Sequence, residues 1–266
     1  MREEALALAA AAEDPARRLN VLREYLQAFT LRSLHESEAA LNLTFVGGTA
    51  LRLLFGLPRF SEDLDFSLAV AEGYEPVAWM EKLKRDMTRA GFDTAISWND
   101  RKTVHTAWIR VGGLLKDAGL SGLAPQKLSV KLEIDTRPPA GGTVVSTVLT
   151  RHFTFVVRHH DRSSLMAGKL HALLTRPYPK GRDWFDLLWY CSLRPPVSPN
   201  LELLQNALDQ TEGAGTVDAG HWRGLLRARA AKIDVEALRR DVSPFLERAA
   251  DVVLLSAENI ESALAV

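Results

Sequence analysis

Residues 45–52 read FVGGTALR, and residues 59–66 read RFSEDLDF. In the first segment an apolar run ends in two glycines, which predicts a strand that turns sharply into a helix. The backbone amides at the start of that helix would point at a ligand, and the helix dipole favours an anion there. Gly47, Gly48 and Thr49 therefore form a candidate phosphate-binding turn. A pair of glycines that only serves a turn is the alternative.

The second segment alternates acidic and apolar residues, which is typical of a strand over residues 63–68. Side chains two residues apart on a strand share a face, so Asp63 and Asp65 project together. Two neighbouring carboxylates repel each other unless a cation lies between them, and Mg²⁺ is commonly held by a few carboxylates and by substrate phosphates. Asp63 and Asp65 are therefore candidate ligands of Mg²⁺ or Mn²⁺. Solvated strand residues are the alternative.

A later alternating segment, residues 127–136, offers a third carboxylate. Its apolar residues would face the core, so Glu133 and Asp135 share the opposite face with Lys131. The pattern does not choose between Glu133 and Asp135 as the third metal ligand. A solvent-facing strand in which Lys131 pairs with the acids also remains open.

The remaining periodicity predicts a mixed first part and a helical last part. We expect an α/β domain with N-terminal helices over residues 1–158 and a helical domain over residues 159–266, with the strongest candidate for a binding cleft at the seam, which the helical domain would close. The expected strands are 41–46, 63–68, 92–98, 103–111, 127–136, 144–149 and 153–157. The expected helices are 1–18, 15–39, 49–55, 76–90, 165–174, 183–191, 201–208 and 220–231, with further helix up to residue 264.

One lysine stands out within the helical part. In the helix expected over residues 165–174, Lys169 falls on the apolar half, four residues after Leu165 and four before Leu173. A lysine on a buried stripe needs a reason, and reaching a triphosphate in a cleft would supply one. A side chain that extends from the edge of the core into water is the alternative.

Composition limits the possible partners. The chain has 266 residues with 33 basic and 33 acidic side chains, so its formal charge is zero and any RNA contact must come from a local patch. A single cysteine excludes an internal disulfide and agrees with a reducing cytoplasm. The sequence has no apolar run of the roughly 20 residues that a membrane span needs, so we expect a cytoplasmic protein. We also expect the six scattered tryptophans to lie in the core.

The order Gly-Gly-Thr, Asp-x-Asp and a carboxylate on a later strand resembles the polymerase-β-like nucleotidyltransferase superfamily. In its detailed form, the segment from Gly47 to Phe66 is similar to the AbiEii/AbiGii toxin family. That family also carries a helix with a lysine, then Arg-Asp and a second aspartate, which match Lys169, Asp183 and Asp186. The resemblance implies an α+β fold with a polymerase-β-like core, a mixed sheet with flanking helices, and a C-terminal helical bundle.

The resemblance also implies an activity. It predicts metal-dependent transfer of a nucleoside monophosphate from an NTP to an acceptor, above all RNA at a tRNA 3′ end, by the toxin of a toxin–antitoxin system with a cognate antitoxin as partner. A small-molecule or protein acceptor, a non-catalytic nucleotide-binding module and a metal nuclease are the other interpretations.

The residues expected to act fall into two overlapping groups. Two of these residues also have structural alternatives: Arg52 could pair with a nearby acid, and Asp183 could cap a helix. Ser61 could be a strand-entry hydroxyl, or a site where phosphorylation blocks triphosphate binding. The catalytic candidates are Asp63, Asp65, Glu133, Asp135, Lys169 and Asp183, and the nucleotide-binding candidates are Gly47, Gly48, Thr49, Arg52, Ser61, Lys169 and Asp186.

Overall fold

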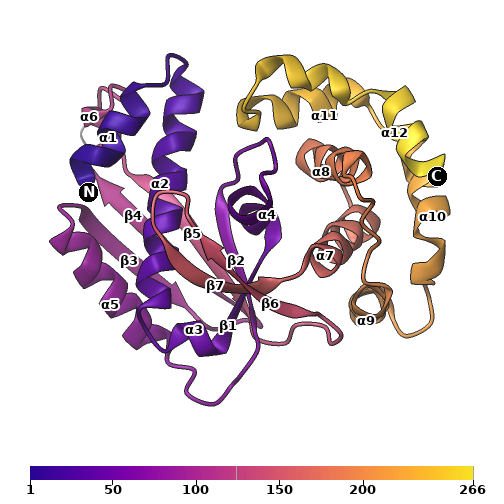
Figure 1. Cartoon of the computed structure of the whole chain (residues 1–266), viewed down its shortest axis with the longest axis horizontal. Helices are drawn as coiled ribbons and strands as arrows, with labels where there is room; N and C mark the ends of the chain where they lie inside the picture. The colour runs from indigo at the N-terminus through magenta and orange to yellow at the C-terminus, as the bar shows by residue number, and fades with distance from the viewer. Residues whose placement is uncertain (124, 266) are drawn as a thin grey trace. The chain divides into compact units, whose positions relative to one another are not determined.

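The computed structural model describes residues 1–123 and 125–265, and the chain forms two compact units (Figure 1). Unit 1 consists of Met1–Gly56, Phe60–Arg137 and Val145–His159. Unit 2 consists of Leu57–Arg59, Pro138–Val144 and His160–Val266, of which residue 266 lies outside the described residues. Two short segments that lie early in the sequence, 57–59 and 138–144, thus belong to the helical unit.

Unit 1 is built on a mixed seven-stranded sheet with the order β3-β4-β5-β2-β1-β7-β6. Strand β2 runs parallel to β5, and β1 runs parallel to β7. The pairs β1–β2, β3–β4 and β4–β5 are antiparallel. The strands are β1 (Leu43–Val46), β2 (Asp63–Leu68), β3 (Asp93–Asn99), β4 (Val104–Gly112), β5 (Leu128–Asp135), β6 (Val144–Leu149) and β7 (Phe155–His160).

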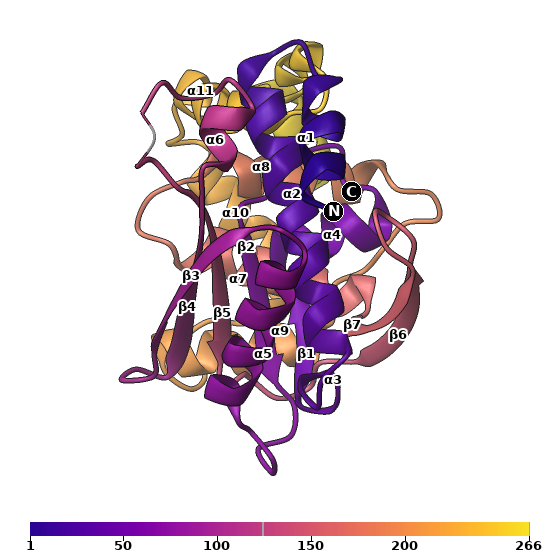
Figure 2. The same cartoon turned by 90° about the vertical axis from the view of Figure 1, so that its left-hand side faces the viewer.

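The two faces of the central strands differ in polarity. Leu64, Leu132 and Ile134 are fully buried, as the alternation predicted, while the acidic residues between them are half-buried on the opposite face. Helices α2 (Pro15–His35) and α5 (Pro76–Arg89) contact each other, and they pack against β5 and β3 respectively (Figure 2). One face of the sheet therefore forms the core of unit 1, and the other carries the polar residues.

The N-terminal segment does not form the single helix predicted for residues 1–18. Helix α1 (Arg2–Ala10) ends before residue 11, and α2 starts at Pro15. The side chain of Asp14 caps α2 by accepting a hydrogen bond of 2.7 Å from the Arg17 amide, and Pro15 occupies the first turn, where its missing N–H costs nothing. The other helices of unit 1 are α3 (Ala39–Asn42), α4 (Gly47–Phe55) and α6 (Leu114–Asp117).

Unit 2 is helical, as predicted for this part of the chain. Helix α7 contacts α8, α9 and α10, and α8 also contacts α11 and α12. The helices are α7 (Arg162–Thr175), α8 (Gly181–Ser192), α9 (Leu201–Glu212), α10 (Trp222–Ala230), α11 (Val235–Val242) and α12 (Ala257–Ala265), with 3₁₀ turns at Ala219–His221, Ser243–Phe245 and Ala249–Leu254. The predicted α+β class is therefore confirmed.

Three predicted features need correction. The first strand starts at Leu43 because residues 39–42 form a short helix, and the strand expected over 153–157 lies at Phe155–His160. The tryptophans are not all in the core, because Trp108 is 39% exposed.

Among residues 1–123 and 125–265, no helix combines the length and the apolar character that a bilayer crossing requires.

Candidate active site

The glycine turn joins β1 directly to α4, which confirms the predicted strand–turn–helix. Gly47 has a φ of +80°, a left-handed conformation that favours glycine. A Cβ atom at Gly47 would lie 2.2 Å from Oδ2 of Asp65, so the backbone approaches this carboxylate more closely than any side chain would allow. The start of α4 and the Asp-x-Asp strand therefore meet at one point.

Thr49 stabilises this arrangement. Its side chain is fully buried, and its hydroxyl donates a hydrogen bond to the backbone carbonyl of Asp63. The hydroxyl thus ties the first turn of α4 to the first residue of β2. Because the Thr49 hydroxyl already donates to Asp63, the groups of this turn that could bind a phosphate are its backbone amides.

The register between β2 and β5 sets the order of the acidic residues. Asp65 lies directly opposite Glu133, and Asp63 lies opposite Lys131. Asp135 lies two pairs further along, opposite Ser67, and its Oδ1 accepts a hydrogen bond of 2.9 Å from the Arg137 amide. Paired residues on neighbouring strands project to the same side, so Asp63, Asp65 and Glu133 share one face.

This donor set suits a hard divalent cation. It consists only of carboxylates, which are the ligands that Mg²⁺ and Mn²⁺ prefer. The space beside Asp65 is one that a Cβ at position 47 would fill. Glu133 is turned towards Lys131, with 2.7 Å between Oε1 and Nζ. Within the part of the chain that the structure describes, no three His, Cys, Asp or Glu side chains already converge on a common point.

Arg52 pairs with a nearby acid, which is the structural alternative that the sequence raised for it. It lies on α4, its side chain is 2% exposed, and its Nε lies 2.7 Å from Oε2 of Glu24 on α2. Nε of Arg151 lies 2.7 Å from Oε1 of the same carboxylate, and His152 lies 3.5 Å from it. Contact of Arg52 with a phosphate stays a prediction.

Glu24 is the centre of this cluster. Burial raises the pKa of Glu24, but the contact with His152 and the charges of Arg52 and Arg151 outweigh burial and lower it to about 2. Sequence reasoning missed Glu24, although a signal was available. Buried polar residues recur on α2 at spacings of four and three, at Asn20, Glu24 and Gln27. A polar stripe within an apolar helix requires partners.

Ser61 precedes the acidic strand and is half-buried. Its backbone carbonyl accepts a hydrogen bond of 3.1 Å from Nε2 of Gln27, which anchors the entry to β2 on the same helix. A role for its hydroxyl in nucleotide binding stays a prediction.

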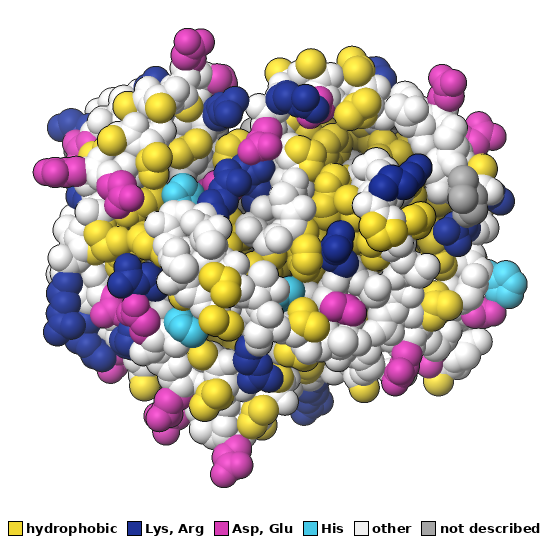
Figure 3. Space-filling view, viewed as in Figure 1, with side chains coloured by type: hydrophobic (Ala, Val, Ile, Leu, Met, Phe, Trp, Pro, Cys, Tyr) yellow, Lys and Arg dark blue, Asp and Glu magenta, His cyan; other side chains and the backbone are white. Residues whose placement is uncertain are grey.

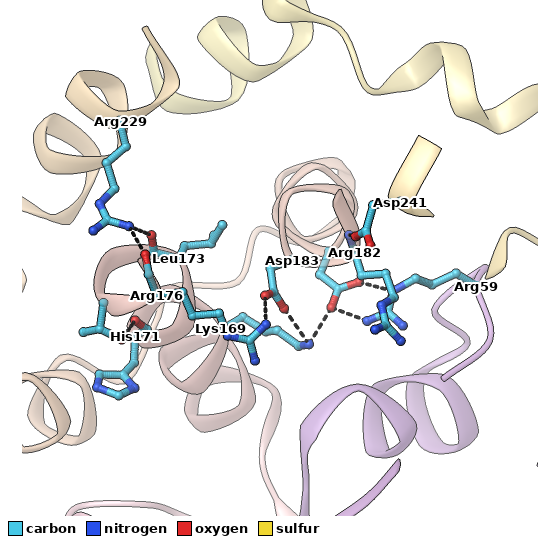
Figure 4. Close-up of polar contacts among 11 residues, drawn as sticks. Arg59, Lys169, His171, Leu173, Arg176, Arg182, Asp183, Arg229 and Asp241 are labelled. Atoms are coloured by element: carbon cyan, nitrogen blue, oxygen red, sulfur yellow. Dashed lines mark hydrogen bonds and ion pairs between the residues drawn. The ribbon is translucent and has the colours of Figure 1, made fainter. Parts of the chain in front are cut away.

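In unit 2, Lys169 belongs to a chain of charges (Figure 4). Its Nζ lies 2.8 Å from Oδ2 of Asp186 and 3.3 Å from Oδ1 of Asp183. Asp186 is fully buried, and its Oδ2 also lies 2.6 Å from Nη2 of Arg59. Nη1 of Arg176 lies 2.7 Å from Oδ2 of Asp183. The structure therefore brings together the three residues Lys169, Asp183 and Asp186 that the sequence singled out in this part of the chain.

The electrostatics of Asp186 follow from this setting. Burial raises its pKa, but the charges and hydrogen bonds of Arg59 and Lys169 outweigh burial and hold the pKa below its ordinary value. Asp183 is not the N-cap of α8, which is Lys180, so the capping alternative is wrong. With Asp186 enclosed, Lys169, Asp183 and Asp186 form a structural ion network, and any contact of these residues with nucleotide stays a prediction.

Comparison with known proteins identifies the family and agrees with the fold. A sequence model of the family described as nucleotidyl transferase AbiEii toxin, type IV TA system, matches residues 30–265. Two solved structures from Helicobacter pylori are similar in fold: JHP933, with 20% identity and a TM-score of 0.53, and a candidate nucleotidyltransferase, with 21% identity and a TM-score of 0.50. The alignments cover 92% of this chain and 90% of the first protein, and 91% and 94% for the second. The chain has no match among curated proteins.

Proposed function

The chain belongs to the AbiEii family of nucleotidyltransferase toxins of type IV toxin–antitoxin systems, and from this premise we propose that it transfers a nucleoside monophosphate from an NTP to an RNA hydroxyl, such as a tRNA 3′ end. The fold supports this, because the mixed sheet with flanking helices is the polymerase-β-like core that the sequence predicted. A cognate antitoxin would then be the partner that counteracts the activity.

One observation carries the proposal: Asp63, Asp65 and Glu133 share a face directly beside the glycine turn. These three carboxylates would hold a divalent cation, Mg²⁺ or Mn²⁺, which when bound would neutralise charge on the reacting phosphate. Glu133, level with Asp65, is the third carboxylate of the proposal. Asp135 is less suited, because it lies two pairs further along and accepts a hydrogen bond from the Arg137 amide.

The remaining roles belong to the backbone and to basic side chains. The amides that open α4 would bind the β- and γ-phosphates, with the dipole of the helix favouring their charge. Lys169 would add a cation for the triphosphate, in competition with its ion pairs to Asp183 and Asp186. Transfer of this kind depends mainly on positioning and on electrostatic stabilisation of the transition state. The bond formed joins the acceptor oxygen to the α-phosphorus, and pyrophosphate leaves.

RNA as acceptor must be reconciled with zero net charge. Figure 3 shows acidic and basic side chains interspersed over one face of the molecule, so recognition would depend on a local group of residues.

The decisive experiment incubates the full chain with each α-³²P-labelled NTP, Mg²⁺ and total RNA. We expect labelled, extended RNA with the wild type and none with Asp65→Ala. Shortened RNA would identify a nuclease, label on protein or on a small molecule would identify another acceptor, and bound NTP with unchanged RNA would identify a binding module. Undiminished labelling by Asp65→Ala would refute the assignment of the site.

A matched pair of variants tests the third carboxylate. Glu133→Gln and Asp135→Asn remove one charge each from the same strand and face. We expect Glu133→Gln to lower the rate of transfer about 100-fold or more, the typical effect of a misplaced reacting group. Asp135→Asn should transfer at nearly the wild-type rate. The reverse order would assign the role to Asp135.

A further inference from the structure

Trp108 is an exposed aromatic residue on the polar face of the sheet. It lies on β4 and is 39% exposed, whereas Trp79 and Trp184 are buried. The alternation of β4 explains this, because Ala107 and Ile109 on either side of Trp108 are fully buried. A large aromatic side chain on a polar face offers a π surface on which a planar ligand can stack.

The register places Trp108 in line with the candidate catalytic acids. Trp108 lies opposite Lys131 of β5, and Lys131 lies opposite Asp63 of β2. Paired residues project to the same side, so Trp108 and Asp63 share one face, two strand spacings or about 10 Å apart. This separation has the size of a nucleotide.

Two cationic side chains lie within 6 Å of the centre of the Trp108 ring. The Arg110 guanidinium carbon lies 5.9 Å from the ring centroid, and Nζ of Lys131 lies 5.8 Å from it. Arg110 is held in place by a hydrogen bond of 2.9 Å to Oγ of Ser97 on the next strand. Lys131 also binds Glu133, so it connects the aromatic residue with the third carboxylate. Proteins bind single-stranded nucleic acid by combining aromatic side chains, on which bases stack, with basic side chains that contact the phosphates.

The direction of the reaction favours this location for the acceptor. In an in-line displacement the attacking oxygen and the leaving pyrophosphate lie on opposite sides of the α-phosphorus. If pyrophosphate leaves at the turn between β1 and α4, the acceptor must approach from the other side of the acids. Along the sheet the order is β4, β5, β2, β1, so that other side is β4, which carries Trp108.

We propose that Trp108, Arg110 and Lys131 form a stacking platform for the 3′-terminal nucleotides of an RNA acceptor. This inference rests on the proposed function, and it specifies the acceptor as a single-stranded RNA end, recognised by stacking and by phosphate charge. Stacking is tolerant of sequence, so the platform would position the terminus and leave the choice of RNA to contacts elsewhere.

The test measures binding of a fluorescein-labelled single-stranded RNA of about ten nucleotides to the full chain by anisotropy. Trp108→Ala is expected to raise the Kd about 5- to 150-fold, the range for loss of stacking on one base. Trp108→Phe should restore most of the affinity. Arg110→Gln should lower the slope of log Kd against log salt by about 0.7, the value for one phosphate contact on a single strand.

The control is Val156→Ala on β7. Val156 is an apolar residue of the same sheet with a similar exposure, 44%, on the far side of the acids in the order of strands. Its substitution should leave RNA binding unchanged. In the transfer assay, Trp108→Ala should raise KM for RNA and leave KM for NTP unchanged, because the phosphate turn lies on the β1 side.

The outcomes separate this inference from the proposed function. If the wild type extends RNA but Trp108→Ala binds and extends it equally well, the platform is wrong and the transferase stands. If the wild type labels only a protein or a small molecule, or binds no RNA, the platform is overturned as well. If RNA binding depends on Trp108 but no NTP transfers label, the platform stands and the transferase assignment fails.

Discussion

Replacing Glu24 by glutamine should destabilise unit 1 in a manner that depends on pH. The substitution keeps the shape of the side chain and removes the negative charge that pairs with Arg52, whose side chain is 2% exposed. Loss of one partner from a buried ion pair typically costs about 3–5 kcal/mol. We therefore expect Glu24→Gln to lower the free energy of unfolding strongly, although Glu24 contacts none of the candidate catalytic acids.

The pKa of Glu24 gives an independent magnitude. A fall from its ordinary value of 4.5 to about 2, at about 1.36 kcal/mol for each unit of pKa, corresponds to about 3 kcal/mol of stability at neutral pH. Because the folded-state pKa is lowered, this contribution is complete above pH 4.5 and is lost as the pH falls towards 2. The difference in the free energy of unfolding between the wild type and Glu24→Gln should therefore be constant near pH 7 and should become smaller below pH 4.5.

Urea denaturation of both proteins at a series of pH values measures this difference directly. Glu36→Gln is the matched control, because Glu36 pairs with Arg32 at 2.8 Å on the surface, with its side chain 47% exposed. Such a pair contributes at most about 1 kcal/mol. A Glu24→Gln effect no larger than that of Glu36→Gln, or one that is the same at pH 3 as at pH 7, would refute the reasoning.

Three further predictions concern the turn, the ion network and the metal. Gly47→Ala should lower transfer about 100-fold, because its Cβ would collide with Asp65. Gly73→Ala, at a similar positive φ but with open space around the new Cβ, should leave transfer unchanged in the labelling assay. Asp186→Asn should lower the free energy of unfolding by about 3–5 kcal/mol, whereas Asp218→Asn, at an exposed side chain, should change it little in the same urea titration. Removal of divalent cations with EDTA should abolish transfer, and added Mg²⁺ or Mn²⁺ should restore it; transfer that persists in EDTA would contradict the metal assignment.

The features that the sequence predicted well are those that depend on local periodicity. Strand β2 has the predicted bounds, and the faces of Asp65 and Glu133 follow from alternation within eight residues or fewer. The glycine turn was equally local, since a positive φ at Gly47 needs only the two glycines and the strand before them. The break before α2 was local too, and the Asp14–Pro15 pair was a sufficient signal for it.

The features that the sequence left open depend on pairing across long separations. The choice between Glu133 and Asp135 depends on a register that joins β2 to β5 across more than sixty residues, and a shift of two residues would have placed Asp135 opposite Asp65. The partner of Arg52 lies 28 residues earlier, on another helix. Trp108 was misassigned because aromatic character was equated with burial, although its alternation with buried neighbours on β4 marked it as outward-facing.

These long-range pairings also explain why the glycine turn can be rigid. The Thr49 hydroxyl holds the turn to β2 from one side, and Arg52, one helical turn later, holds α4 to Glu24. Two anchors within four residues leave the first turn of α4 little freedom to move away from Asp65. Preorganised amides require no rearrangement when charge develops on the phosphates, which is where electrostatic catalysis gains most. The charge of Glu24 would therefore affect transfer through the position of the turn, so Glu24→Gln should raise KM for NTP under conditions where the variant remains folded.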